Sequence, residues 1–190
     1  IVGFDKKITK EEYQEHLENN TILDVMHHEN VTTGDTFYIP KGRVHAIGAG
    51  VLLAEIQQTS DITYRIYDYD RVDAKTEKKR DLHNEQAIDV IDYEVYDTYK
   101  TSYDLVKNTS NTLVHSPYFT TNILDVNTTL FKDYSNLDSF VIFMCVEGNA
   151  SIVYMEKTYH LHCGETILLP AAIQNISIQA KQAKLLEVYY

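Results

Sequence analysis

The sequence contains no tryptophan, only two cysteines and three prolines, and no long apolar run. A membrane-spanning helix needs about 18 or more consecutive apolar residues, so the sequence predicts no transmembrane segment. The N-terminus also lacks a signal-peptide pattern. Cys145 and Cys163 cannot build a disulfide framework or a zinc finger, and both lie in apolar or β-like stretches. We therefore expect two free thiols in a reducing, cytoplasmic location.

Basic residues are also scarce: 17 Lys and Arg stand against 28 Asp and Glu, a net charge of −11. Because nucleic acids and anionic membranes bind clustered Lys and Arg, the sequence predicts neither as a partner. A starting methionine is absent too, since the chain begins at Ile1, and we expect that a further segment precedes it in the gene product. The 190 residues suffice for one large or two small β domains.

The local sequence pattern predicts one N-terminal helix followed by many short strands. Thr9 and Glu12 have the spacing of a capping box, which predicts a helix over residues 9–19. Runs rich in β-branched and aromatic residues then alternate with turn residues, a pattern typical of an antiparallel barrel or sandwich. The predicted strands cover 35–39, 51–57, 62–69, 121–125, 128–134, 140–146, 150–154, 157–161, 166–169 and 185–189. Residues 72–92 interrupt them, with one possible helix at 84–92.

An internal repeat is the most informative feature of the organisation. Residues 34–40 and 164–170 share one template of Gly, an acid, Thr, three apolar residues and Pro, and lie 164 − 34 = 130 positions apart. Each copy predicts a turn into a short strand that the proline ends. Five residues beyond the proline lies His45 in the first copy and Asn175 in the second. Gly, five residues, Pro, four residues, His resembles the second half of the cupin signature.

This resemblance implies a mainly β protein made of two cupin barrels (jelly rolls, or double-stranded β-helices), the first incomplete, with a few short helices. We expect residues 1–75 to be the C-terminal part of a catalytic barrel. Residues 76–115 would form a helical crossing, and residues 116–190 a degenerate second barrel. A cupin barrel holds a metal with a first motif of two or three ligands, which we expect upstream of Ile1.

Histidines are the candidate metal ligands. His45 lies within a template whose second motif supplies one ligand, and a neutral imidazole suits zinc or a similar divalent ion. The alternative is a core histidine on a strand with Val44 and Ile47. His160 and His162 would face the same way on a strand and could share a metal. Because no third ligand is placed beside them, we expect surface or rim histidines instead.

Two further polar residues lie on otherwise apolar runs. Glu55 shares one face with Gln57, as a pair in the mouth of the barrel or as a satisfied polar network. Arg65 is costly in an apolar strand unless its guanidinium meets an anion. It could equally pair with Glu55, Asp61 or Asp68, and spacing alone leaves both interpretations open.

The stretch from Gly34 to Arg71 closely resembles type I mannose-6-phosphate isomerases, in particular the short bacterial form, through His45-Ala-Ile-Gly, Glu55-Ile-Gln-Gln-Thr-Ser-Asp and Thr63-Tyr-Arg-Ile-Tyr. The second half is similar to that family's degenerate C-terminal cupin. The resemblance implies that His45 is the last zinc ligand, Glu55 an active-site carboxylate and Arg65 the catalytic arginine. The family's other ligands, a Gln-x-His pair and a Glu, would lie upstream.

The function so implied is a zinc-dependent aldose–ketose isomerase that interconverts mannose 6-phosphate and fructose 6-phosphate. Its partner would be a small sugar phosphate, with one Zn²⁺ per intact subunit. With one ligand of four, the chain of these 190 residues alone is expected to be inactive. The alternatives are a non-catalytic sugar-binding or regulatory cupin and a cupin enzyme of different metal chemistry, such as an epimerase or oxygenase.

Overall fold

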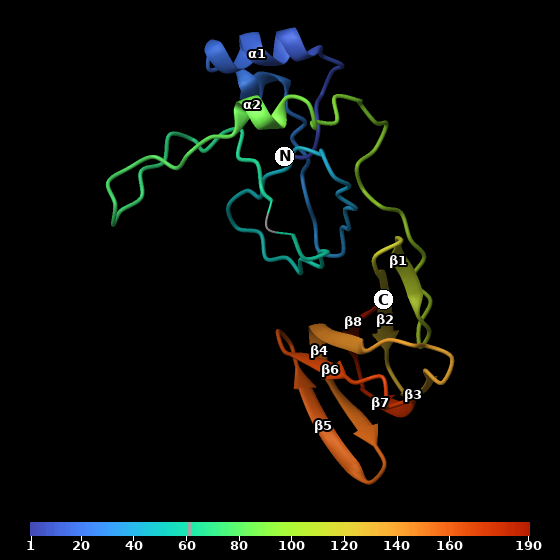
Figure 1. Cartoon of the computed structure of the whole chain (residues 1–190). Coiled ribbons are helices and arrows are strands. Elements are labelled where there is room, and N and C mark those ends of the chain that lie inside the picture. The colour runs from blue at the N-terminus through green and yellow to red at the C-terminus, as the bar shows by residue number, and fades with distance from the viewer. Residues whose placement is uncertain (61) are drawn as a thin grey trace. The chain divides into compact units, whose positions relative to one another are not determined.

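The computed structural model describes residues 1–60 and 62–190, and the chain divides into two compact units, Ile1–Lys100 and Thr101–Tyr190 (Figure 1). The predicted division of the chain at residues 75 and 115 stays a prediction. In the part of the chain that the structure describes, no helix is long and apolar enough to cross a membrane.

The first unit is built around short helices and irregular chain. Its elements are the α-helices α1 (Lys10–Glu18) and α2 (Asn84–Ala87) and the 3₁₀-helix η1 (Ile22–Val25). The capping box that starts α1 is present, because Thr9 Oγ1 accepts from the Glu12 amide at 3.2 Å and Glu12 Oε2 accepts from the Thr9 amide at 2.8 Å. This confirms the first predicted helix, whereas the helix predicted over 84–92 is only the single turn of α2. A small core lies beneath these helices: Phe4, Ile8, Tyr13, Ile22, Val25 and Met26.

The strands predicted over 35–39, 51–57 and 62–69 do not form ladders in the described residues of the first unit. Pairing there is confined to isolated bridges, such as Val2 with His45 and Phe37 with Lys100. A strand is stabilised by hydrogen bonds to a neighbour on at least one side. These segments have the β-branched and aromatic residues typical of strands, but the prediction that they form paired strands was wrong.

The second unit is a curled antiparallel sheet of eight strands (Figure 1). They are β1 (Asn111–His115), β2 (Thr120–Val126), β3 (Thr129–Asp133), β4 (Val141–Tyr154), β5 (Lys157–His162), β6 (Thr166–Leu169), β7 (Asn175–Gln179) and β8 (Ala183–Tyr189). The order is β1-β2-β8-β4-β7-β3, with β5 and β6 also paired to β4. The prediction of a mainly β jelly-roll unit is confirmed, although β1 and β7 were not among the predicted strands.

Strand β4 replaces the two strands predicted over 140–146 and 150–154. Its first half pairs with β6 and β8, and its second half pairs with β5 and β7. The register shifts between Cys145 and Glu147, as in a β-bulge, and the buried positions change from odd to even numbers. Such a bulge bends a strand and re-aims its side chains. One strand can therefore line both sides of the curled sheet.

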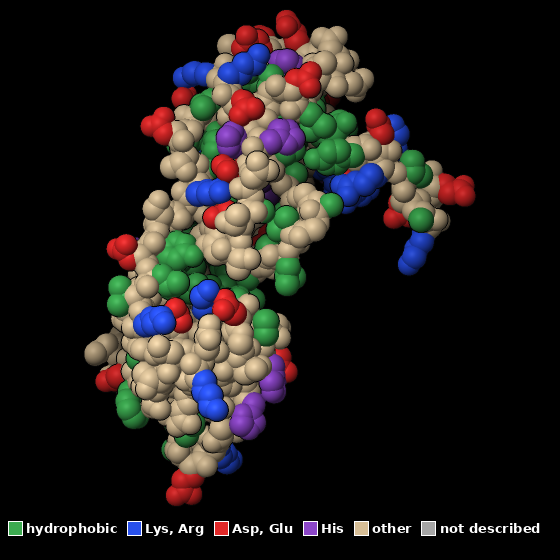
Figure 2. All heavy atoms as spheres, turned by 180° about the vertical axis from the view of Figure 1, so that it is seen from behind, with side chains coloured by type: hydrophobic (Ala, Val, Ile, Leu, Met, Phe, Trp, Pro, Cys, Tyr) green, Lys and Arg blue, Asp and Glu red, His purple; other side chains and the backbone are tan. Residues whose placement is uncertain are grey.

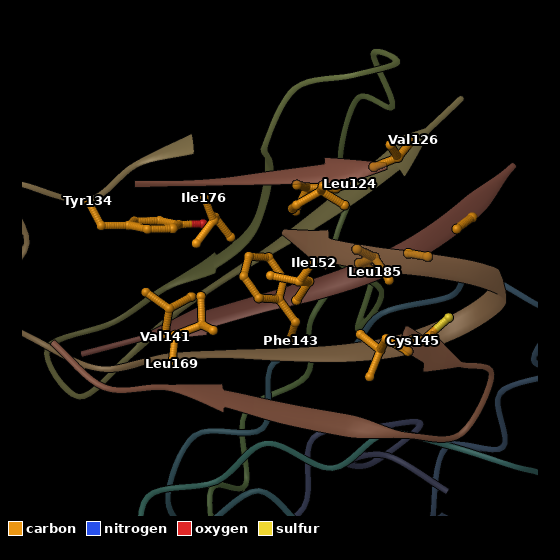
Figure 3. Packing of buried hydrophobic residues seen from close by; sticks show 14 residues of the cluster. Leu124, Val126, Tyr134, Val141, Phe143, Cys145, Ile152, Leu169, Ile176 and Leu185 are labelled. Carbon is orange, nitrogen blue, oxygen red and sulfur yellow. The ribbon is translucent and has the colours of Figure 1, made fainter. Parts of the chain in front are cut away.

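The core of the second unit lies inside this curled sheet. Phe143, Ile152 and Leu185, from β4 and β8, are fully buried, and in Figure 3 they point toward one another from different parts of the sheet. The alternation of buried and less buried residues along each strand places one face inside and the other in solvent. Cys145 lies in this core, whereas Cys163 is exposed, and both are free thiols.

Candidate functional site

The repeat that the sequence predicts is visible in the backbone. In the first copy, the Asp35 amide donates to the Thr32 carbonyl at 3.1 Å, and the Asp35 side chain accepts from the Thr32 amide at 2.8 Å. In the second copy, Glu165 and His162 make the same two bonds, at 2.9 and 2.8 Å. The same turn therefore precedes both Gly-to-Pro segments.

A second turn follows each proline. The Arg43 amide donates to the Pro40 carbonyl at 3.2 Å, and the Ile173 amide donates to the Pro170 carbonyl at 2.9 Å. Two residues beyond each turn lies the position that carries histidine in the first copy and asparagine in the second. The turns on both sides of the two template segments are thus equivalent, although only the second segment forms a paired strand, β6.

The side chain of His45 is exposed, and hydrogen bonds to the N-terminal residues hold its backbone. It bridges to Val2, and the neighbouring Ala46 amide donates to the Ile1 carbonyl at 3.0 Å. The ring Nδ1 lies 3.0 Å from the Arg43 carbonyl, to which it donates. Donation from Nδ1 to a carbonyl fixes the tautomer that leaves Nε2 free as an acceptor, which is the usual arrangement of a metal-binding histidine.

Arg65 is half-buried, and its backbone makes two hydrogen bonds with His83, one to the side chain and one to the backbone. The Arg65 amide donates to His83 Nδ1 at 3.1 Å, and the His83 amide donates to the Arg65 carbonyl at 2.8 Å. The guanidinium makes one long contact, from Nη1 to the Asp81 carbonyl at 3.4 Å. Within the described residues no carboxylate pairs with Arg65.

Of the described carboxylates that could pair with Arg65, Asp68 is bound by other arginines and Glu55 makes no hydrogen bond or ion pair with it. Asp68 instead binds Arg71 and Arg80, and these two guanidinium groups hold the pKa of Asp68 down to about 2. Asp61 lies outside the described residues. Glu55 is exposed and, among the residues described, makes no hydrogen bond or ion pair with Arg65.

The three predicted site residues are therefore not brought together by direct contacts. Across residues 1–60 and 62–190, no group of three or more His, Cys, Asp or Glu side chains is placed to hold a metal ion. His45 and Glu55 are exposed and Arg65 is half-buried. The roles assigned to them from the family resemblance stay predictions.

Arg43 is a residue whose surroundings the sequence did not reveal. Its side chain is only 7% exposed, and it donates to Asp92 Oδ2 from Nη2 at 2.9 Å and from Nε at 3.1 Å. Its guanidinium carbon also lies 4.2 Å from the Tyr96 ring centre and 5.0 Å from that of Tyr99. Paired and stacked in this way, Arg43 is a structural anchor for the turn that carries His45.

A buried charge network lies in the second unit. Glu187 on β8 is 1% exposed and accepts from Lys132 Nζ at 2.8 Å, Ser110 Oγ at 2.7 Å and Asn122 Nδ2 at 2.8 Å, with Tyr134 as a further donor. Burial alone would raise the pKa of Glu187, but Lys132 and these hydrogen bonds lower it below its usual range. A lone acid in the apolar run of residues 185–189 was the available signal.

The geometry of the second unit defines a class of protein. One long bulged strand shared by both halves of a curled antiparallel sheet, with a Gly-to-Pro strand between paired turns, is a cupin fold. A family model described as "Mannose-6-phosphate isomerase, cupin domain" matches residues 109–190.

The similarity to individual relatives also includes the first unit. Mannose-6-phosphate isomerase ManA of Bacillus subtilis is 31% identical over 173 residues, which is 90% of this chain and 54% of that protein. The Streptococcus mutans mannose-6-phosphate isomerase is 34% identical over 146 residues, or 76% of this chain and 45% of that protein. The crystal structure of the Bacillus subtilis enzyme matches with a TM-score of 0.86 at 30% identity, over 100% of this chain and 59% of that one.

The chain is thus similar to mannose-6-phosphate isomerases in both units, and residues 109–190 match the cupin domain of that family. The chain spans about half the length of the curated relatives it matches. The family resemblance stated from the 34–71 segment is thereby confirmed.

Proposed function

We propose that the protein is an aldose–ketose isomerase that interconverts mannose 6-phosphate and fructose 6-phosphate. The observation that carries this proposal is the structural match of this whole chain to 59% of the Bacillus subtilis mannose-6-phosphate isomerase, at a TM-score of 0.86. That match includes the first unit, in which the family resemblance places His45, Glu55 and Arg65. The free thiols Cys145 and Cys163 support a reducing, cytoplasmic location.

His45 is the one residue of this chain that we propose as a ligand of the catalytic zinc. His45 fits a ligand, because its Nδ1 is engaged by a carbonyl and its Nε2 is free. A catalytic zinc centre has three protein ligands and an open position, and the described residues offer no such group. The donors in the described residues therefore do not by themselves complete a catalytic zinc centre.

Arg65 would act on the charge that develops during isomerisation. The reaction moves a proton between C2 and C1 of the sugar through a cis-enediol, so negative charge develops on an oxygen bonded to one of these carbons. A fixed guanidinium stabilises such a charge more than it stabilises the neutral substrate. The paired backbone of Arg65 and its lack of a carboxylate partner in the described part of the chain suit this role.

Glu55 is proposed to orient a ligand or to carry a proton. A carboxylate can accept a proton from a sugar hydroxyl or carbon when it lies within hydrogen-bond reach of that group. In this structure Glu55 is exposed, so its role rests on the family resemblance.

A non-catalytic sugar-binding cupin is the second candidate. It is favoured by the absence, among the described residues, of any three-ligand metal group. A coupled assay for fructose 6-phosphate formation, run on the intact protein with added Zn²⁺, separates the two functions. Turnover of mannose 6-phosphate supports the isomerase. Binding of the sugar phosphate without turnover would contradict it and support the binder.

A further inference from the structure

Strand β5 exposes a pair of histidines that the proposed isomerase does not use. His160 and His162 alternate with Leu161, which is 2% exposed, so both imidazoles lie on the solvent face of the sheet. Figure 2 shows histidine side chains gathered side by side on the surface of the second unit. Two histidines at this spacing on one strand face are close enough to bind one metal ion.

In both histidines Nδ1 lies beside an oxygen of a neighbouring side chain, and Nε2 is the nitrogen left for a metal. His162 Nδ1 lies 2.9 Å from Glu165 Oε2, and His160 Nδ1 lies 3.0 Å from Ser151 Oγ. When Nδ1–H donates to these oxygens, Nε2 of each ring is left with a free lone pair. A carboxylate or hydroxyl behind the imidazole is the typical outer shell of a metal-binding histidine. The sequence did not show that Glu165 takes this position.

The internal repeat indicates that the His162 ring is not needed for the turn. In the first copy of the turn, Thr32 and Asp35 occupy the positions of His162 and Glu165. The backbone amide bond to the acid is the same in both copies, at 2.8 Å. The imidazole contact with Glu165 is therefore an addition to a turn that already forms without histidine.

The surface around the histidines is polar and hollow. Cross-strand pairs join Thr129 to Gln179, Gln179 to Ser151 and Ser151 to His160, so these four side chains form one row on one face. A surface hollow of about 450 Å³ lies along this row and includes both histidines and Lys181. It leaves room for water on a bound ion. The chain's net charge of −11 favours cations over anions in its surroundings.

We propose that His160 and His162 form a surface site for a first-row divalent transition metal, such as Zn²⁺ or Cu²⁺, bound through the two Nε2 atoms. Water completes the coordination, since the described residues contain no group of three His, Cys, Asp or Glu ligands. Imidazole nitrogen is a preferred ligand of both ions. The site lies in the second unit and does not depend on the proposed isomerase function.

The test is calorimetric titration of the metal-free protein with Zn²⁺, using single variants. We expect His160→Gln and His162→Gln each to weaken this binding at least about tenfold, and Glu165→Gln to weaken it by about 10-fold through loss of the outer-shell carboxylate. His115→Gln is the matched control, since His115 also lies on a strand of the second unit with its Nδ1 2.8 Å from a hydroxyl, that of Thr120. His45→Gln should leave this binding unchanged, which separates it from the zinc of the proposed isomerase.

A second experiment counts the histidine ligands of the bound metal by spectroscopy. With Cu²⁺ as the probe, electron paramagnetic resonance should show two imidazole nitrogens in the wild-type protein and one in His162→Gln. Wild-type affinity in both histidine variants, or an equal loss in His115→Gln, would overturn the proposal.

Discussion

The surroundings of some single residues could be predicted from the sequence, and those of others could not. The repeated template matches a turn that recurs after both prolines, at Arg43 and at Ile173, whereas the role of His45 stays a prediction. The burial of Arg43 against Asp92 and Tyr96 was not predictable, because these partners lie about 50 residues further along the chain. Their meeting depends on the tertiary fold. A lysine or arginine beside a turn otherwise resembles a solvated surface charge.

Glu187 gives a prediction at this scale. Replacing it with glutamine leaves Lys132, which is 17% exposed, without its 2.8 Å partner. We expect Glu187→Gln to lower the free energy of unfolding at pH 7 by about 3–5 kcal/mol, because breaking a buried pair leaves an uncompensated charge. Urea unfolding followed by circular dichroism measures this. The double variant Glu187→Gln/Lys132→Met should regain much of the loss, and a double variant as unstable as the single one would contradict the explanation.

The pH dependence of the same variant has a definite sign. The folded-state pKa of Glu187 is lowered, so its contribution to stability is present above the ordinary glutamate pKa of about 4.3 and is lost as pH falls through the folded value. The difference in stability between wild type and Glu187→Gln should therefore shrink in acid. A difference that grows below pH 4 would contradict the charge network.

At the scale of elements, local signals were reliable where one segment supplies all the information. The capping box predicted the start of α1, and Gly34 and Gly164 both adopt positive φ values, of 98° and 89°, in the turns that the repeat predicted. The sequence predicted two strands, over 140–146 and 150–154, but the structure has one strand, β4, with a bulge between Cys145 and Glu147. The bulge depends on pairing with β8, which lies almost 40 residues further along the chain. Sequence periodicity cannot show that pairing.

The capping box provides a prediction for α1. Thr9→Ala removes the hydroxyl that accepts from the Glu12 amide. We expect a loss of about 1 kcal/mol in helix stability, and hence about fivefold faster amide hydrogen exchange across residues 10–18. Glu12→Gln is the control, because an amide oxygen can still accept from the Thr9 backbone. Exchange in Thr9→Ala that matches wild type would show that packing of Tyr13, not the cap, determines the helix start.

At the scale of the whole molecule, the jelly-roll class was predictable for the second unit, whose strands all find partners within residues 111–189. The first unit contains equally β-like segments, yet its described residues pair only through isolated bridges. Composition reports the preference of a segment for a sheet, whereas the ladder depends on a neighbouring strand. For the same reason, the resemblance that names His45, Glu55 and Arg65 does not place them in contact.

We propose that Arg65 acts in sugar-phosphate isomerisation. This is tested by the rate of fructose 6-phosphate formation from mannose 6-phosphate by the protein, compared between wild type, Arg65→Ala and Arg71→Ala. Arg71 is the matched control, because its partner Asp68 keeps Arg80 when Arg71 is lost. We expect Arg65→Ala to lower kcat by about 100- to 1000-fold and Arg71→Ala to remain near wild type. Normal turnover in Arg65→Ala, or an equal loss in both variants, would contradict it.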